Sequence, residues 1–241
     1  MAKRRREDDS PSPEKRQKID DEERRRLGKA LVLAARSGNT DVVERLLAVP
    51  GIDVNARHMG DTALIMAAWS GHTDVVERLL AVRGIDVNAK GSKFDAGFTA
   101  LTWAATNGHA DVVELLLAAP GIDVNAKTDA GNTALMKAAS HGDTDIVRRL
   151  LAAPGIDVKA KGRWGGNTAL MLAAENGHTD VVNLIRGLIA RRRFRGIVRM
   201  RPGLRDAKVR AAERVYAPGG PGYNEIFARQ KLNFKEGLDE I

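Results

Sequence analysis

The sequence contains no cysteine, which excludes disulfide bonds and thiolate metal ligands. Aromatic residues make up only 4% of the chain, as expected when leucine and small residues build thin stacked layers. No apolar run reaches about 18 residues, the length that indicates a membrane-spanning helix. The N-terminus is charged from the third residue and lacks the apolar segment of a secretory signal. We therefore expect a soluble, intracellular protein.

Motifs that carry chemistry are also absent from the sequence. It has no H-E-x-x-H, no G-x-x-x-x-G-K-[ST] and no G-x-S-x-G. His72, His109 and His178 occupy one slot that recurs along the chain, so we interpret them as structural. His58 and His141 have no partner at metal-binding spacing. The sequence therefore predicts neither an enzyme nor a cofactor or metal site.

What the sequence does contain is one unit repeated along most of its length. The triplet T-A-L recurs in steps of 37, 34 and 35 residues, beginning at Thr62, Thr99, Thr133 and Thr168. A glycine recurs in the same register at Gly38, Gly71, Gly108, Gly142 and Gly177. So does the segment I-D-V-(N/K), beginning at Ile52, Ile85, Ile122 and Ile156. A fixed period of this length indicates a stacked repeat architecture.

Each unit reads as two helices and a turn. Thr99 is a natural N-cap for a first helix, since its hydroxyl can accept an otherwise unpaired backbone N–H. Gly108 permits the positive φ of a tight helix-to-helix turn. Asp111 opens a second helix whose apolar residues follow helical spacing, and Pro120-Gly121 ends it. The sequence therefore predicts two antiparallel helices followed by a protruding hairpin.

These units resemble the ankyrin repeat, whose consensus places a TPLHxAAxxGH segment before LLxxGADVNA. The resemblance covers Leu27 to Ala190. It implies an all-α ankyrin-repeat solenoid of five stacked helix-turn-helix units, at residues 27–56, 57–89, 90–126, 127–160 and 161–190. The P-G-I-D-V-N-A spelling resembles ankyrin families of giant viruses and protists. In the family, the asparagine of this segment braces the hairpin, and it is also the position that some asparaginyl hydroxylases modify. The matching residues here are Asn55, Asn88 and Asn125.

The resemblance also implies a non-enzymatic scaffold or adaptor that binds a protein partner on its concave face. The family's contact positions are the hairpin tips and the residues around the double alanine of each first helix. Carried over to this sequence, they include Arg57, His58, Met59, Met66, Trp69, Ser70, Phe94, Phe98, Trp103, Thr106, Asn107, Lys137, Ser140, His141, Arg163, Trp164, Glu175 and Asn176. Because tryptophan and arginine dominate binding energy at interfaces, we expect the three tryptophans to be anchors. The alternative is that they pack between neighbouring first helices.

Residues 1–26 contain 10 basic and 8 acidic residues and almost nothing apolar, so we expect them to be disordered. Two basic clusters resemble a bipartite nuclear import signal: Lys3, Arg4, Arg5 and Arg6, then Lys15, Arg16 and Lys18. This favours a nuclear location, with a cytoplasmic one as the alternative. The other interpretation is a solubilising, charge-mixed tail.

Residues 191–241 carry 13 basic and 6 acidic residues, whereas residues 27–190 carry 16 and 17. We expect a basic, partly helical extension. Its polyanion-binding residues would include Arg191, Arg192, Arg193, Arg195, Arg199, Arg201 and Arg205. Nucleic acid, another acidic partner and a merely solvated helix face are the three interpretations of this cluster. The extension could also cover the end of the fifth unit. The protein is expected to be a monomer.

Overall fold

The computed structural model describes residues 13–91, 97–163 and 166–198, with side chains in the ranges 21–91, 97–163 and 166–192. The chain divides into two compact units, Met1–Arg186 and Gly187–Ile241. The first contains the repeat stack. Of the second, only the end of one helix lies in the described ranges.

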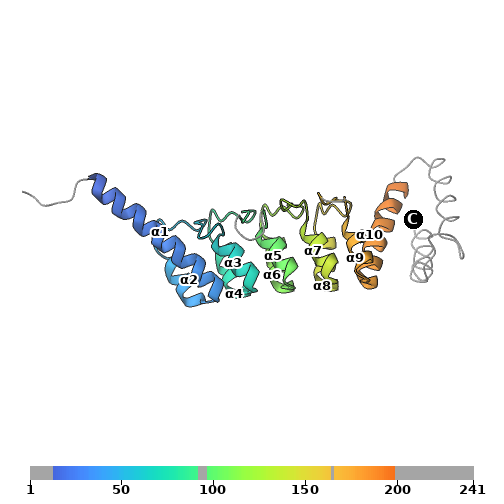
Figure 1. The fold of residues 1–241 in the computed structure, drawn as a ribbon, viewed down its shortest axis with the longest axis horizontal. Helices are drawn as coiled ribbons and strands as arrows, with labels where there is room; N and C mark the ends of the chain where they lie inside the picture. The colour runs from blue at the N-terminus through green and yellow to red at the C-terminus, as the bar shows by residue number, and fades with distance from the viewer. Residues whose placement is uncertain (1–12, 92–96, 164–165, 199–241) are drawn as a thin grey trace, which may run out of the picture. The chain divides into compact units, whose positions relative to one another are not determined.

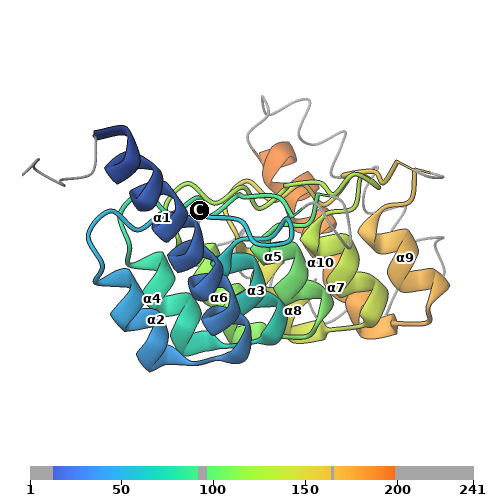
Figure 2. The same ribbon diagram turned by 60° about the vertical axis from the view of Figure 1, so that its left-hand side comes forward.

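Ten helices and no strand are found in the described ranges. They are α1 (Pro13–Ser37), α2 (Thr40–Leu47), α3 (Ala63–Ser70), α4 (Thr73–Leu80), α5 (Ala100–Thr106), α6 (Ala110–Ala118), α7 (Ala134–His141), α8 (Thr144–Ala152), α9 (Ala169–Glu175) and α10 (Thr179–Val198). The odd-numbered helices pack side by side in one layer, and α2, α4, α6 and α8 pack in a second. Figures 1 and 2 show the pairs in a row, with the connecting loops, here called fingers, along one side. The predicted all-α repeat solenoid is confirmed.

Each first helix from α3 onward begins at a threonine cap, as the sequence predicts. The cap residues have extended backbone, and each hydroxyl accepts a bond from the N–H three residues on. The caps are Thr62, Thr99, Thr133 and Thr168. At the other end of α5, Gly108 has φ +79°, the left-handed conformation that the turn requires.

The core lies between the two helix layers and is built from the same slots in every unit. Leu64, Leu101 and Leu135 are 1% exposed on the first helices. On the second helices, Val43, Val76, Val113 and Val147 are completely buried. Because the same apolar side chain fills the same slot in successive units, each unit buries its apolar face against the neighbouring units.

The prediction that residues 1–26 are disordered is wrong for residues 13–26, because α1 already begins at Pro13. Proline is tolerated in the first turn of a helix, where its missing N–H costs nothing. Opposite charges one turn apart support the exposed part: Arg24 lies 3.7 Å from Asp21, and Arg26 lies 2.7 Å from Glu22. The same helix then buries Leu31 in the stack. Residues 1–12 lie outside the described residues.

The helix α10 continues to Val198, so residues 191–198, the start of the basic extension, are helical. Residues 199–241 lie outside the described ranges, and the rest of that prediction is not described by the structure. In the ranges that are described, no helix is long and apolar enough to cross a membrane.

Candidate protein-interaction surface

The candidate surface consists of the fingers and the outward slots of the first helices, and we call it the contact face. In each first helix, one outward slot precedes the double alanine and another follows it. The slots before it hold Leu33, Met66, Trp103, Lys137 and Leu172. The slots after it hold Arg36, Trp69, Thr106, Ser140 and Glu175. None of these residues is fully buried, so the repeat geometry presents one row of each to solvent.

Large apolar side chains are exposed at the N-terminal end of this face. Met59 is 54% exposed, Leu33 is 44% exposed and Trp69 is 37% exposed. Met66, in the same helix as Trp69, is half-buried. Burial of such side chains by a partner would stabilise a complex, because apolar area removed from water contributes about 25 cal/mol per Å².

Met59 lies at the tip of the second unit's finger in an unusual backbone conformation. It has φ +57°, and among the described residues it is the one non-glycine with a positive φ. The tip is closed by two backbone bonds between His58 and Asp61, of 3.0 and 3.3 Å. A left-handed conformation costs an L-residue about 1–2 kcal/mol. The finger therefore holds an exposed methionine where glycine would fit more easily.

Two cations lie over aromatic rings of the contact face. The guanidinium of Arg36 is 5.6 Å from the ring centre of Trp69, and the ammonium of Lys137 is 5.0 Å from that of Phe98. The Phe98 ring also packs at 4.6 Å, tilted by 40°, against Trp103. These contacts fix the aromatic rings and keep positive charge beside them.

The structure corrects one predicted contact residue. Phe98 is only 4% exposed, because Trp103 and Lys137 cover its ring. It therefore contributes to the core of the third unit rather than to an accessible surface. Trp103 is half-buried and packs against Phe98 of its own unit, and its role as a binding anchor stays a prediction.

Several other predicted contact residues bond to the protein's own backbone. Four of them reach the preceding unit: Ser70 donates to the Arg36 carbonyl at 3.0 Å, Asn107 to that of Trp69 at 2.7 Å, Asn176 to that of Ser140 at 2.7 Å, and Arg163 to that of Asp129 at 3.3 Å. Two more bonds each lie within one helix, from Thr106 to the Thr102 carbonyl and between His141 and the Lys137 carbonyl. These side chains are partly exposed yet already fixed in place, which favours a preorganised surface.

Leu33 and Arg36 are contact-face residues that the sequence reasoning missed. They occupy, in the first unit, the same slots before and after the double alanine as Met66 and Trp69 in the second. The alanine pair Ala34-Ala35 was the signal that could have found them. The first unit lacks the T-A-L start, so the contact positions were carried over only from the second unit onward.

Some predicted residues lie outside what the structure describes. Phe94 and Trp164 are not described. Of the import residues, Lys15, Arg16 and Lys18 lie in the first turns of α1, and the others precede it. Arg191 and Arg192 are exposed on α10. The backbones of Arg193 and Arg195 lie in α10 as well, whereas Arg199, Arg201 and Arg205 lie beyond it.

The asparagines of the repeated segment brace neighbouring fingers, as the resemblance implies. The side chain of Asn88 donates to the Gly121 carbonyl and accepts from the Asp123 N–H, both at 2.8 Å. Asn55 makes the equivalent pair of bonds with Gly84 and Asp86. Asn125 does so with Gly155 and Asp157. Each asparagine thus joins its own unit to the next one.

One carboxyl group of the contact face, that of Asp61, has a shifted pKa. The Asp61 side chain, at the base of the second finger, is only 6% exposed. Burial raises the pKa of this carboxyl above its usual range, and the nearby Arg57 guanidinium partly opposes that rise. Arg57 is exposed and donates to the Gly60 carbonyl at 2.8 Å and to the Lys90 carbonyl at 2.6 Å.

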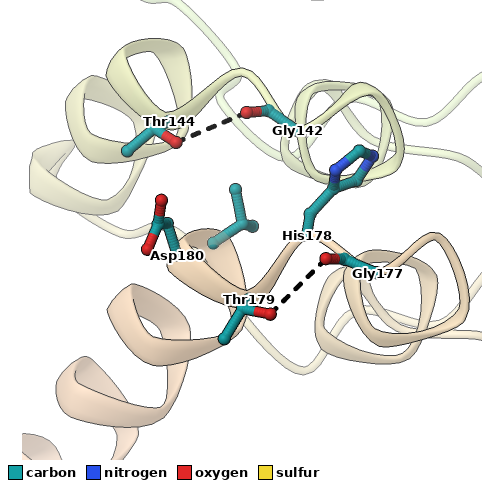
Figure 3. Close-up of a pocket in the computed structure, with 7 residues that line it drawn as sticks. Gly142, Thr144, Gly177, His178, Thr179 and Asp180 are labelled. Carbon is teal, nitrogen blue, oxygen red and sulfur yellow. Dashed lines mark hydrogen bonds between the residues drawn. The ribbon is translucent and has the colours of Figure 1, made fainter.

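A depression of about 320 Å³ lies at the turns before α8 and α10 (Figure 3). The hydroxyls of Thr144 and Thr179 donate to the carbonyls of Gly142 and Gly177 in it. An equivalent depression of about 330 Å³ lies before α2 and α4. Because the hollow recurs with the repeat, it follows from the architecture. No cluster of three or more metal-ligating side chains occurs in the described part of the chain.

Comparison with known proteins agrees with this geometry. The family model for ankyrin repeats in three copies matches residues 15–91, 31–128 and 121–188. The chain belongs to the ankyrin repeat family. A comparison with curated proteins found no match. Ankyrin repeats generally mediate protein–protein interaction, and the family is typically non-enzymatic.

Proposed function

We propose that this ankyrin repeat protein is a non-enzymatic scaffold or adaptor that binds a protein partner on its concave contact face. One observation carries the proposal. Of the four large apolar side chains exposed in the described residues, three are Leu33, Met59 and Trp69, in contact slots of the first two units. The fourth is Met171, in α9. Aromatic and apolar anchors gathered in this way are typical of the energetic centre of an interface.

The fixed surroundings of these anchors support the same conclusion. Trp69 is covered on one side by Arg36, and its backbone carbonyl accepts a bond from Asn107. A side chain that is held before binding loses less conformational entropy on binding. The contact face therefore meets the requirements of a preformed binding surface rather than one that orders on contact.

The test is affinity capture from cell extract with the full-length protein and quantitative mass spectrometry. The combined variant Met59→Ala and Trp69→Ala should lose the partners that the wild type retains. Arg45→Ala is the matched control, because Arg45 is exposed on α2 in the other helix layer. Equal capture by all three proteins would refute the contact face as the binding site.

We also propose import into the nucleus through the two basic clusters of the head. Import receptors bind such side chains on an extended chain, whereas Lys15, Arg16 and Lys18 lie in the first turns of α1. Those turns would therefore unwind on binding. Replacing the residues of both clusters with alanine in a fluorescent fusion should move the protein from nucleus to cytoplasm. An unchanged distribution would contradict an import signal.

Contact with nucleic acid through the basic extension is the second candidate function. The exposure of Arg191 and Arg192 on consecutive positions of α10 favours it. Fluorescence anisotropy with labelled duplex DNA and single-stranded RNA should then show binding by the full-length chain. Binding should weaken steeply between about 50 and 200 mM salt. Replacing Arg191, Arg192, Arg193 and Arg195 with glutamine should abolish it.

A further inference from the structure

The fingers carry a row of cations that the sequence reasoning did not assign as a group. One basic residue follows the V-N-A or V-K-A segment of each of the first four units, and all four side chains are exposed. We call these residues the finger cation row: Arg57, Lys90, Lys127 and Lys161.

Bonds along the stack make this row continuous. Arg57 donates to the Lys90 carbonyl at 2.6 Å, Lys90 to the Lys127 carbonyl at 2.8 Å, and Lys127 to the Lys161 carbonyl at 3.1 Å. Each side chain thus lies along the fingers, reaching to the next member of the row. An ammonium has three N–H donors, so a lysine that makes one such bond has others to offer a ligand.

The other charges on the contact face are of both signs. Arg36, Lys137 and Arg163 add three cations, and Arg83 and Lys159 add two more on the fingers. The exposed acids are Asp129, Glu175 and the finger aspartates Asp53, Asp86, Asp123 and Asp157. Asp61 is buried, and its pKa is raised. The repeat stack as a whole has nearly equal numbers of acids and bases. With the four members of the row, nine cations stand against six exposed acids on this face, and this excess of positive charge favours an acidic ligand.

The spacing of the row restricts the shape of that ligand. Packed helices lie about 8–10 Å apart, so neighbouring cations lie about one helix spacing apart. An extended peptide advances about 3.3 Å per residue. Acidic side chains at about every third residue would therefore face successive members of the row.

The apolar side chains at one end of the face determine the orientation in which the ligand would bind. Met59 lies in the finger that begins with Arg57, at the end of the row where Trp69 and Leu33 are also exposed. Met59 and Leu33 offer no hydrogen-bond donor that could read a nucleotide base, and their apolar side chains favour an apolar anchor on the ligand. The surface is thus cationic along its length and apolar at one end.

From these features, and resting on the contact-face function proposed above, we infer the chemistry of the partner. We propose that the finger cation row binds an extended acidic peptide segment whose apolar or aromatic anchor packs against Met59 and Trp69. The acidic side chains set the register along the row, and the anchor fixes the end. Affinity for such a segment falls as salt rises, because exposed charges are screened.

The probe is a displayed library of random linear peptides, selected on the full-length protein. Enriched sequences should contain aspartate or glutamate at intervals of about three residues, with an apolar or aromatic residue near one end. The same peptides, labelled and measured by anisotropy, should bind at least tenfold more weakly to the variant Lys90→Glu and Lys127→Glu. The matched control is Arg45→Glu and Arg148→Glu, which changes the net charge equally on exposed positions of the second helices and should leave binding unchanged.

Helical content and melting temperature of each variant are measured first, and Lys90→Gln with Lys127→Gln provides a neutral variant if the glutamates unfold the fingers. Selected peptides that bind through Trp69 but lack acids, or that ignore both lysine variants, would overturn the acidic-segment inference while leaving the contact-face function intact. Binding of labelled oligothymidine, but of no peptide, with the same loss in the lysine variants would overturn it in favour of single-stranded nucleic acid. Absence of binding by either probe would overturn it as well.

Discussion

The imidazole Nε2 of His109 lies 3.2 Å from the backbone carbonyl oxygen of Trp69 in the preceding unit. A carbonyl oxygen only accepts, so this nitrogen carries the proton in the bond. The same relationship joins His72 to Arg36 at 3.0 Å and His178 to Ser140 at 3.0 Å. The recurring histidines therefore tie the turn of one unit to the first helix of the unit before it, as their repeated slot suggests.

Gly71→Ala should destabilise the protein more than Gly108→Ala. Both glycines have a positive φ, of +78° and +79°, so both substitutions introduce backbone strain of about 1–2 kcal/mol. A Cβ at Gly71 would also lie 2.6 Å from the His109 ring, whereas one at Gly108 would meet nothing within 4 Å. Urea unfolding should show an additional loss of about 1–3 kcal/mol for Gly71→Ala. Equal losses would show that the ring moves aside freely.

Asn88→Ala should lower the free energy of unfolding by about 1–3 kcal/mol, because two bonds to the next finger are lost at once. Lys159→Ala is the control, since Lys159 stands in the asparagine slot of the fourth unit and its side chain is exposed. We expect that substitution to change stability by less than about 0.5 kcal/mol. Thermal unfolding followed by circular dichroism makes the comparison, and similar effects for both variants would contradict a bracing role.

Asp61→Asn should stabilise the protein at neutral pH. Because burial raises the pKa of the Asp61 carboxyl in the folded state above that of the unfolded chain, the folded protein binds the proton more tightly. The carboxylate therefore opposes folding at neutral pH, and this cost disappears once the pH falls below the pKa of the unfolded chain. Melting temperatures of the two proteins should differ at neutral pH and converge in acid. A wild type that is the more stable protein at neutral pH would contradict the assignment.

Trp69→Ala and Phe98→Ala should separate binding from folding. Phe98 is 4% exposed, so its truncation should cost about 3–5 kcal/mol of stability. Trp69 is 37% exposed and lies against Arg36, so its truncation should cost about 1 kcal/mol and mainly weaken partner binding. Urea unfolding and binding of a selected peptide are measured on both variants. A large loss of stability in Trp69→Ala would make that residue part of the core.

The parts of the fold that could be predicted from sequence are those that recur. Thr99 and Gly108 have one local role each, set by cap and turn geometry, and the structure confirms both. Asn88 could be interpreted because the family braces its hairpins with that residue, and its bonds to the next finger confirm this. In each case the same local interaction is repeated in several units, so the sequence of one unit helps to interpret the same position in the next.

The parts that could not be predicted depend on a contact made once. Phe98 stands in a slot that holds the polar residues Asp61, Asn132 and Asn167 in other units, and its ring packs with Trp103 and Lys137, which are specific to its neighbourhood. Likewise, the head of α1 has the composition of a disordered segment. It is helical because it continues a helix whose later part is anchored in the stack by Leu31. Composition alone does not contain that information.

The junction between the third and fourth units differs from the other three junctions because its turn lacks the hydrogen bond from a histidine. Asp143 stands there in the histidine slot, so this junction has no imidazole bond. Exposed ion pairs join second helices at two junctions: Arg149 pairs with Glu114 and, at 4.0 Å, with Asp111 at this one, and Arg78 pairs with Glu44 at 2.7 Å between the first and second units. Exposed ion pairs weaken as ionic strength rises, whereas bonds to backbone carbonyls change little. Dissolved salt therefore weakens the ion pairs of both junctions, and of the two only the junction between the third and fourth units lacks an imidazole bond that would remain.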